Sequence, residues 1–199
     1  MSLGTEARPY DLAIIGGGLA GLSLAVRLAR PQFRHLSILL IEPRRSYARD
    51  HTWSCWSVRD HPFTGITRSW NMWIVASGQR IVRRSAPGIT YGAISADDLY
   101  ALSLRIIGQA PWITRLAAGV EALEEQGELV AIGGGAEKLH ARQVFDSRPP
   151  SGASRSGLRQ IFLGQEIETG RDVFDPAAAM PGRSSALRQP GTTQRGAAR

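Results

Sequence analysis

The apolar residues near the start of the chain form two short continuous runs with a helical pattern between them. The runs lie within residues 10–15 and 37–41, and each has the length of a buried strand. The apolar residues between them recur with the spacing of one helix face: Leu22, Ala25, Val26 and Ala29. The pattern therefore predicts a βαβ unit over residues 10–42.

After residue 42 the patterns of apolar and polar residues are shorter. Residues 43–71 have no clear periodicity and are expected to be irregular. Residues 72–76 and 80–84 predict a hairpin, and Ser95 predicts an N-cap because Asp97 and Asp98 follow it. The helix that begins there is expected to turn Leu99, Leu102 and Ile106 inward. Residues 113–146 are expected to be β-rich, with strands near 120–123, 128–132 and 141–145, and residues 161–168 predict a further strand.

A glycine turn joins the first strand to the first helix. It has the form G-x-G-x-x-G, with its glycines at 16, 18 and 21, and Glu42 ends the second strand about twenty residues further on. Gly16 allows a sharp turn, Gly18 lets a pyrophosphate approach the backbone, and Gly21 lets the helix pack on the strand. We expect cofactor contacts from the whole turn and from the acid: Gly16, Gly17, Gly18, Leu19, Ala20, Gly21 and Glu42. The alternative is a glycine turn in another kind of α/β protein.

Composition narrows the class of protein. Among the 199 residues, 43% are hydrophobic, which is enough for a core, and no apolar run approaches the length of a membrane span. Cys55 is the only cysteine, which excludes an internal disulfide and fits a cytoplasmic protein. The net charge is +7, but four of the arginines lie in residues 181–199, and no recognition motif indicates a nucleic-acid partner. These last residues contain no acid or aromatic side chain, so we expect a disordered basic tail.

Besides residues 11–21, four short segments of the chain are distinctive: His51-Thr-Trp-Ser54, Phe145-Asp-Ser-Arg148, Phe162-Leu-Gly-Gln-Glu166 and Phe174-Asp-Pro176. Together these segments resemble the bacterial lycopene β-cyclases, a family of FAD-dependent carotenoid cyclases. The resemblance implies an α/β fold: a Rossmann-like FAD-binding domain of the glutathione-reductase type with an inserted β-rich segment. It covers roughly residues 9–179. We expect a flexible end at residues 1–9, this domain with part of a substrate domain at 10–180, and the tail at 181–199.

The resemblance also implies an activity. Family members fold rings onto the ends of lycopene, a membrane-dissolved linear carotene, by a redox-neutral reaction that a proton initiates. They use FAD that NAD(P)H keeps reduced, and their substrate implies peripheral contact with the inner face of the cytoplasmic membrane. Family members are roughly twice as long as this chain, and residues after 180 lack the family's apolar continuation. We therefore expect a truncated or frameshifted chain that is inactive alone.

There are further candidate residues, and most of them have an alternative interpretation. His51 is placed near the flavin, or is a loop histidine that bonds the backbone. Asp146, at a strand end, is expected to contact the cofactor. Glu166 is the candidate proton donor, because a carboxylic acid in a dry groove has a raised pKa; the alternative is a surface carboxylate. Arg44, Arg45 and Arg49 either contact the cofactor or lie in a solvated loop.

Two features of composition have open interpretations. The tryptophans at 53, 56, 70 and 73 form either an aromatic wall for an apolar polyene or ordinary packing. Gly133-Gly-Gly135 is expected to be a hairpin tip rather than a second nucleotide site, since no helix follows it. Two rival functions remain at this point: an FAD-dependent monooxygenase or related oxidoreductase, and a non-catalytic remnant.

Overall fold

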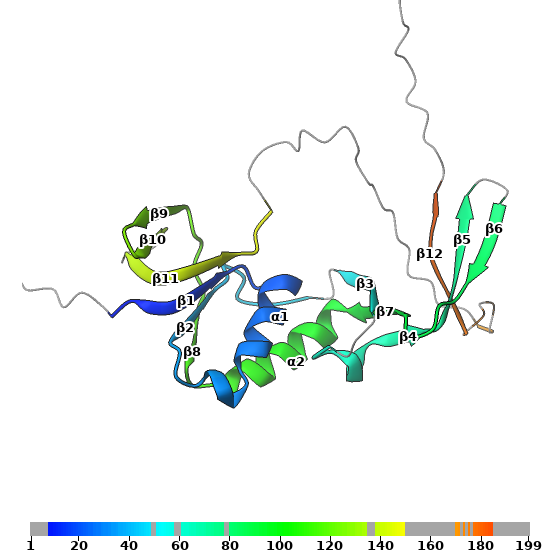
Figure 1. Ribbon diagram of the computed structural model, residues 1–199, viewed down its shortest axis with the longest axis horizontal. Helices are drawn as coiled ribbons and strands as arrows, with labels where there is room; N and C mark the ends of the chain where they lie inside the picture. Colours follow the sequence, from blue (N-terminus) through cyan, green and yellow to red (C-terminus); the bar gives the residue numbers. More distant parts are fainter. Residues whose placement is uncertain are drawn as a thin grey trace, which may run out of the picture. The chain divides into compact units, whose positions relative to one another are not determined.

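The computed structural model describes residues 8–48, 51–57, 61–77, 80–134, 138–149, 170, 171, 173, 175 and 177–184. Two compact units divide the chain by their internal contacts. Unit 1 comprises Met1–Trp53, Asp60–Thr67 and Ala93–Gln165, and unit 2 comprises Ser54–Arg59, Arg68–Gly92 and Glu166–Arg199. Figure 1 shows the elements of both units.

A six-stranded sheet forms the centre of unit 1, in the order β8-β2-β1-β11-β10-β9 (Figure 1). The strands are β1 (Tyr10–Ile15), β2 (Ile38–Ile41), β8 (Ile113–Leu116), β9 (Ala122–Gln126), β10 (Leu129–Gly133) and β11 (Leu139–Asp146). The four strands β8, β2, β1 and β11 run parallel, and β10 and β9 continue the sheet antiparallel. The register pairs Ile15 with both Ile41 and Asp146, so three strands end side by side.

Helices α1 (Leu19–Leu28) and α2 (Ala96–Gly108) pack with one face of this sheet. Alternate strand residues such as Ile14 and Leu40 are buried in the core that the helices share. Their neighbours Ala13 and Leu39 are buried in a second cluster with Ile132 of β10. Both faces of β1 and β2 are therefore covered, which explains their continuous apolar runs.

The predicted βαβ unit is confirmed, and so is the N-cap position of Ser95. The inward face of α2 is broader than predicted, because Tyr100, Ser103 and Ile107 are buried along with Leu99. Leu102 and Ile106, predicted to turn inward, are only partly buried but do pack against the core.

The expectation of an irregular segment over residues 43–71 is wrong in part. Strands β3 (Thr52–Ser57) and β4 (Arg68–Trp70) and a short 3-10 helix (Thr64–Ile66) lie in this segment. Another 3-10 helix, Pro31–Phe33, lies earlier in the chain, between α1 and β2. β3 and β4 flank β7 (Thr90–Ser95) in a three-stranded sheet. Pairing with a strand far along the chain leaves no local periodic signal, so the sequence pattern did not reveal it.

A separate three-stranded sheet has the order β12-β5-β6. The predicted hairpin is confirmed as β5 (Met72–Ser77) antiparallel to β6 (Arg80–Arg84). β12 (Ala178–Ser184) runs parallel to β5. The predicted disordered tail is therefore wrong for residues 181–184, whose backbone pairs with β5; residues 185–199 and 1–7 lie outside the described residues.

Candidate functional site: the glycine turn and the end of strand β2

The glycine turn after β1 has a separate steric requirement at each glycine. Gly16 has φ +95°, a conformation that glycine adopts without strain. A Cβ atom on Gly21 would lie 1.9 Å from the carbonyl oxygen of Gly16, so the first turn of α1 approaches the end of β1 too closely for any side chain. These observations confirm the geometric part of the prediction for Gly16 and Gly21.

Gly18 differs from the other glycines of the turn. It is the N-cap of α1, no side chain caps the helix there, and no acid lies in its first turn. Among the residues that the structure describes, none other than the two chain neighbours of Gly18 has an atom within 4 Å of a Cβ placed on this glycine. Space thus lies open beside a helix N-terminus, whose N–H groups and positive dipole end favour phosphate. Leu19 and Ala20 form the first turn, where Ala20 is exposed and Leu19 packs partly against the core.

Glu42 follows β2 and binds back to the turn. Its Oε2 accepts a hydrogen bond of 2.5 Å from Gly17 N, and its Oε1 accepts bonds from Arg44 N (3.0 Å) and Arg44 Nε (2.9 Å). The side chain is 12% exposed. Burial raises the pKa of Glu42, but the bonds from Arg44 and Gly17 outweigh it and hold the pKa below its ordinary value.

The Arg44 side chain lies across the turn. Its Nη2 donates to Gly17 O (3.3 Å) and its Nη1 donates to Tyr100 Oη (3.2 Å). The guanidinium also lies 4.9 Å from the ring centre of Tyr47 and 5.5 Å from that of Tyr100. The bond to Glu42, more than any other contact, raises the pKa of Arg44 above its ordinary value. The Arg44 side chain is nevertheless 37% exposed, so it lies at the surface of the loop while making these contacts, and its contact with a cofactor stays a prediction.

A row of rings leads from this arginine to His51. The ring centres of Tyr47 and Tyr100 are 4.3 Å apart, Tyr100 meets Trp53 edge-on at 5.7 Å, and Trp53 stacks on His51 at 5.7 Å. The carbonyl of His51 accepts a bond from Ala96 N at the start of α2. His51 is thus an exposed residue whose carbonyl bonds the start of α2, and its place near a flavin stays a proposal.

Asp146 ends β11 beside the turn. Both of its carboxylate oxygens accept bonds from Arg148, the shortest 2.8 Å from Nη2, and Arg148 Nη1 also donates to Val120 O. These bonds lower the pKa of Asp146. Next to it, Ser147 Oγ donates to Ile15 O (2.8 Å) and lies 3.3 Å from Gly16 O, which ties the ends of β11 and β1 together.

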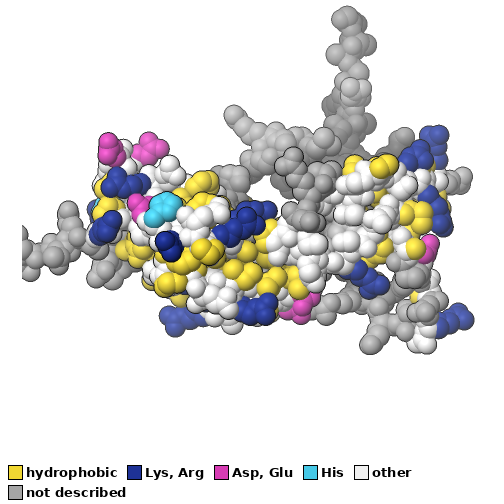
Figure 2. Space-filling model, turned by 60° about the horizontal axis from the view of Figure 1, so that its bottom comes forward, with side chains coloured by type: hydrophobic (Ala, Val, Ile, Leu, Met, Phe, Trp, Pro, Cys, Tyr) yellow, Lys and Arg dark blue, Asp and Glu magenta, His cyan; other side chains and the backbone are white. Residues whose placement is uncertain are grey.

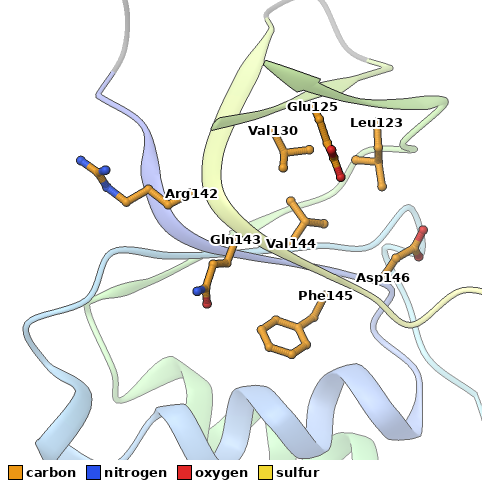
Figure 3. Close-up of a pocket in the computed structure, with 8 residues that line it drawn as sticks. All are labelled: Leu123, Glu125, Val130, Arg142, Gln143, Val144, Phe145 and Asp146. Carbon is orange, nitrogen blue, oxygen red and sulfur yellow. The ribbon is translucent and has the colours of Figure 1, made fainter. Parts of the chain in front are cut away.

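A hollow of about 580 Å³ lies along β11 and includes Asp146 in its lining (Figure 3). Gln143 and Phe145 point to the side of the sheet that carries the helices, whereas Val130 and Val144 point to the other side. Phe145 is 49% exposed. The sequence did not predict this hollow, because a strand pattern does not reveal that the Phe145 side chain is half exposed.

The tryptophans divide between the two units. Trp53 belongs to the row of rings in unit 1. In unit 2, Trp56 and Trp70 lie 4.9 and 6.3 Å from Tyr91, and Trp73 lies 6.3 Å from Trp56. Tyr91 is buried and donates to Ser54 Oγ (2.7 Å), whereas Trp56 is 52% exposed. The cluster therefore packs around Tyr91 and leaves Trp56 half exposed.

Some of the predicted residues fall outside the part of the chain that the structure describes. Glu166 and Arg49 lie outside the described residues, as does most of the Phe174-Asp-Pro176 segment. Arg45 is exposed. The described residues include no cluster of three or more metal-ligating side chains. Neither α1 nor α2 is long and apolar enough to cross a membrane, and they are the two α-helices described. On the face in Figure 2, Lys and Arg side chains lie in several separate groups.

The sequence reasoning missed three participants in the site: Tyr47, Tyr100 and Ser147. Tyr100 follows Leu99 on the buried face of α2, and its hydroxyl reaches Arg44 across 56 residues of sequence. Nothing local signals that contact. Ser147 could have been noticed, because a small hydroxyl residue after a strand often bonds a neighbouring carbonyl.

The parallel sheet, the glycine turn and the acid after β2 define a Rossmann-like domain of the FAD-binding type. Residues 11–181 match the family described as lycopene cyclase protein. The chain belongs to this family. No curated protein sequence matches it.

Several solved structures have a similar fold and longer chains. Examples are p-nitrophenol 4-monooxygenase PnpA of Pseudomonas putida DLL-E4 (13% identity, TM-score 0.51), P. aeruginosa PqsL in complex with 2-aminobenzoylacetate (18%, 0.53) and RebC-10x, native and K252c-bound (17%, 0.52). The similarity covers 69%, 69% and 75% of this chain, but 40%, 42% and 34% of theirs. This level of identity shows the fold, and the chain spans well under half of each structure.

Glu42 gives the site a defined pH dependence. Because its folded-state pKa is lowered, its contribution to stability is complete above the ordinary value of 4.5 and is lost as the pH falls through the lower folded-state pKa. We expect the difference in unfolding free energy between wild type and Glu42→Gln to be constant between about pH 5 and about pH 7 and to shrink below about pH 4.5. Urea titrations across this range measure it, and a difference that grows on acidification would contradict the assignment.

Ser147 gives a prediction for the fold alone. Ser147→Ala removes the hydroxyl that bonds Ile15 O, and we expect a loss of about 1 kcal/mol in unfolding free energy. Ser85→Ala, at an exposed position, is the matched control and should change stability little. Equal effects of the two changes would show that the Ser147 bond contributes nothing to holding the strand ends together.

Proposed function

We propose that the chain is the FAD-binding part of a flavoprotein that cyclises the ends of lycopene. Membership of the lycopene cyclase family supports the substrate and the reaction. The observation that supports FAD as the cofactor is the open space at Gly18 beside a helix N-terminus that no side chain caps, with Glu42 at the end of the neighbouring strand. A pyrophosphate fits the space at the helix N-terminus, and a ribose hydroxyl fits the Glu42 carboxylate.

The residues that we propose for the cofactor are those of the turn and the two strand ends. Gly17, Gly18, Leu19 and Ala20 present the backbone, Gly16 and Gly21 hold its shape, and Glu42 takes the ribose. Asp146 lies in register with Ile15, beside the turn, and His51 lies at the far end of the ring row. Bound FAD, kept reduced by NAD(P)H, would supply a reduced flavin that favours a cationic reaction path without net oxidation.

The proposed carotene substrate is apolar and water-insoluble, which requires an apolar surface and peripheral contact with a membrane. Trp56 is half exposed, and its ring lies next to those of Trp73 and Tyr91. An aromatic face attracts both a polyene and a developing positive charge. We propose this cluster as part of the carotene-binding surface and keep Glu166 as the proposed proton donor.

The first test is the identity of the flavin. The purified chain should release FAD rather than FMN on denaturation, because the glycine turn and Glu42 are proposed to bind the ADP half of FAD, which FMN lacks. Chromatography of the released cofactor measures this. Release of FMN would contradict the proposed site.

The second test concerns the product. In lycopene-accumulating cells, an intact family member containing this chain should yield a cyclic carotene of unchanged mass. An FAD monooxygenase, which is the alternative that the shared fold leaves open, would add the mass of an oxygen atom. Mass spectrometry and the absorption spectrum of extracted carotenoids separate these outcomes.

A further inference from the structure

The hydrogen bonds around Glu42 determine how many ribose hydroxyls it can accept. A carboxylate has about four acceptor positions, two on each oxygen. Oε1 already accepts two donors from Arg44, its backbone N and its Nε. Oε2 accepts one donor, Gly17 N. One acceptor position therefore remains, on Oε2.

Arg44 is held in this arrangement from three further sides. Its guanidinium donates to Gly17 O and to Tyr100 Oη and lies near the rings of Tyr47 and Tyr100. A planar guanidinium with several satisfied N–H groups is costly to displace. A ligand hydroxyl that sought Oε1 would have to displace Arg44 Nε and break this set of contacts.

The Arg44 side chain also fixes the turn. Gly17 is bound through both of its backbone polar groups, since its N donates to Glu42 and its O accepts from Arg44. A Cβ atom on Gly17 would lie 2.6 Å from Tyr47 Oη and 2.9 Å from Glu42 Cγ, so the peptide fits tightly between these side chains. Glu42 and the glycine turn therefore present one defined geometry to a ligand.

We propose that Arg44 determines the specificity of the site by restricting Glu42 to a single ribose hydroxyl of an adenosine diphosphate group. The inference rests on the proposed function, because it concerns the same nucleotide site. Arg44 acts as a positioning residue: it blocks Oε1 and leaves Oε2 as the acceptor. Removal of its side chain frees one position on Oε1, because only the backbone N of residue 44 still donates to that oxygen.

The test compares ADP with 2′-deoxy-ADP and 3′-deoxy-ADP by calorimetric titration of the full chain. With wild type, loss of one hydroxyl should weaken binding about tenfold, as expected for a bond to a charged group, and loss of the other should change it less than about twofold. With Arg44→Met, which keeps an apolar stem beside the tyrosines, loss of either hydroxyl should weaken binding. Arg45→Met, at the exposed neighbouring position, is the control and should behave as wild type.

The outcomes separate this inference from the proposed function. Equal losses for both deoxynucleotides with wild type would overturn the role of Arg44 while leaving the nucleotide site intact, and so would an Arg44→Met profile identical to that of wild type. Failure of wild type to bind ADP would overturn both. Glu42→Gln provides a check that does not depend on Arg44: its amide nitrogen cannot accept, and the wild-type discrimination between the two deoxynucleotides should disappear.

Discussion

Gly18→Val should fold normally and lose FAD. The position has φ −83° and ψ −166°, an extended conformation that valine adopts readily. A Cβ atom there meets no atom within 4 Å from the described part of the chain, apart from its two chain neighbours. The valine methyl groups would instead fill the space in which we place the pyrophosphate. We expect retained flavin to fall by at least about tenfold, because the phosphates would lose their contact with the helix N-terminus.

Two measurements separate binding from folding in this variant. The flavin absorbance per protein of the purified variant reports retention, and the melting temperature of the cofactor-free protein reports the fold. Gly18→Ala serves as the graded control, with a smaller loss of flavin and the same melting temperature. Full retention of FAD in Gly18→Val would overturn the position that we propose for the pyrophosphate. A large drop in the melting temperature of the cofactor-free variant would instead show that the space is not open.

The parts of the fold that the sequence predicted are those whose signals are local. The strand, glycine turn, helix and second strand are contiguous over residues 10–42, so periodicity and glycine spacing were sufficient. The hairpin of β5 and β6 is local in the same way. β3 and β7 were missed because they pair with each other across more than thirty residues, which no window of sequence reports.

The candidate site shows the same limit. Gly16 and Gly21 were identified from spacing, and the steric roles predicted for them agree with the structure. Glu42 was identified in the same way, but its bonds to Gly17 and Arg44 were not predicted, and its contact with a ribose stays a proposal. The role of Arg44 could not be predicted, because it depends on Tyr100, a residue of α2 that the fold brings to the turn. For Arg44, sequence could name the residue type but not the atoms that it contacts.

The tail illustrates a different limit. Residues 181–199 lack the apolar side chains that a core requires, and this predicted disorder from residue 181. Strand β12 nevertheless continues to Ser184, because a strand can be held by backbone pairing with β5 whatever its side chains are. Composition indicates how much apolar surface the side chains can bury, but it does not indicate whether the backbone pairs with another strand.

Gly21→Ala should have the largest effect on folding. The added methyl group would lie 1.9 Å from Gly16 O and 3.2 Å from Ser147 Oγ, and the first of these is backbone at the end of a buried strand. Neither α1 nor β1 can move away cheaply, since Leu22 and Ile14 on the two elements are both fully buried. We expect a loss of at least about 3 kcal/mol in unfolding free energy, comparable with the severe end of core overpacking.

The matched control for this prediction is Ala20→Gly. It introduces the opposite change one position earlier in the same helical turn, at an exposed residue, and should cost only about 1 kcal/mol through helix propensity. Chemical denaturation of the two variants without cofactor gives both values on one scale. If Gly21→Ala were as stable as wild type, the close approach of α1 to β1 would be disproved, and the explanation of the third glycine would fail with it. If it unfolds as expected, FAD retention will also be lost, because the helix N-terminus that we propose for the phosphates depends on this packing.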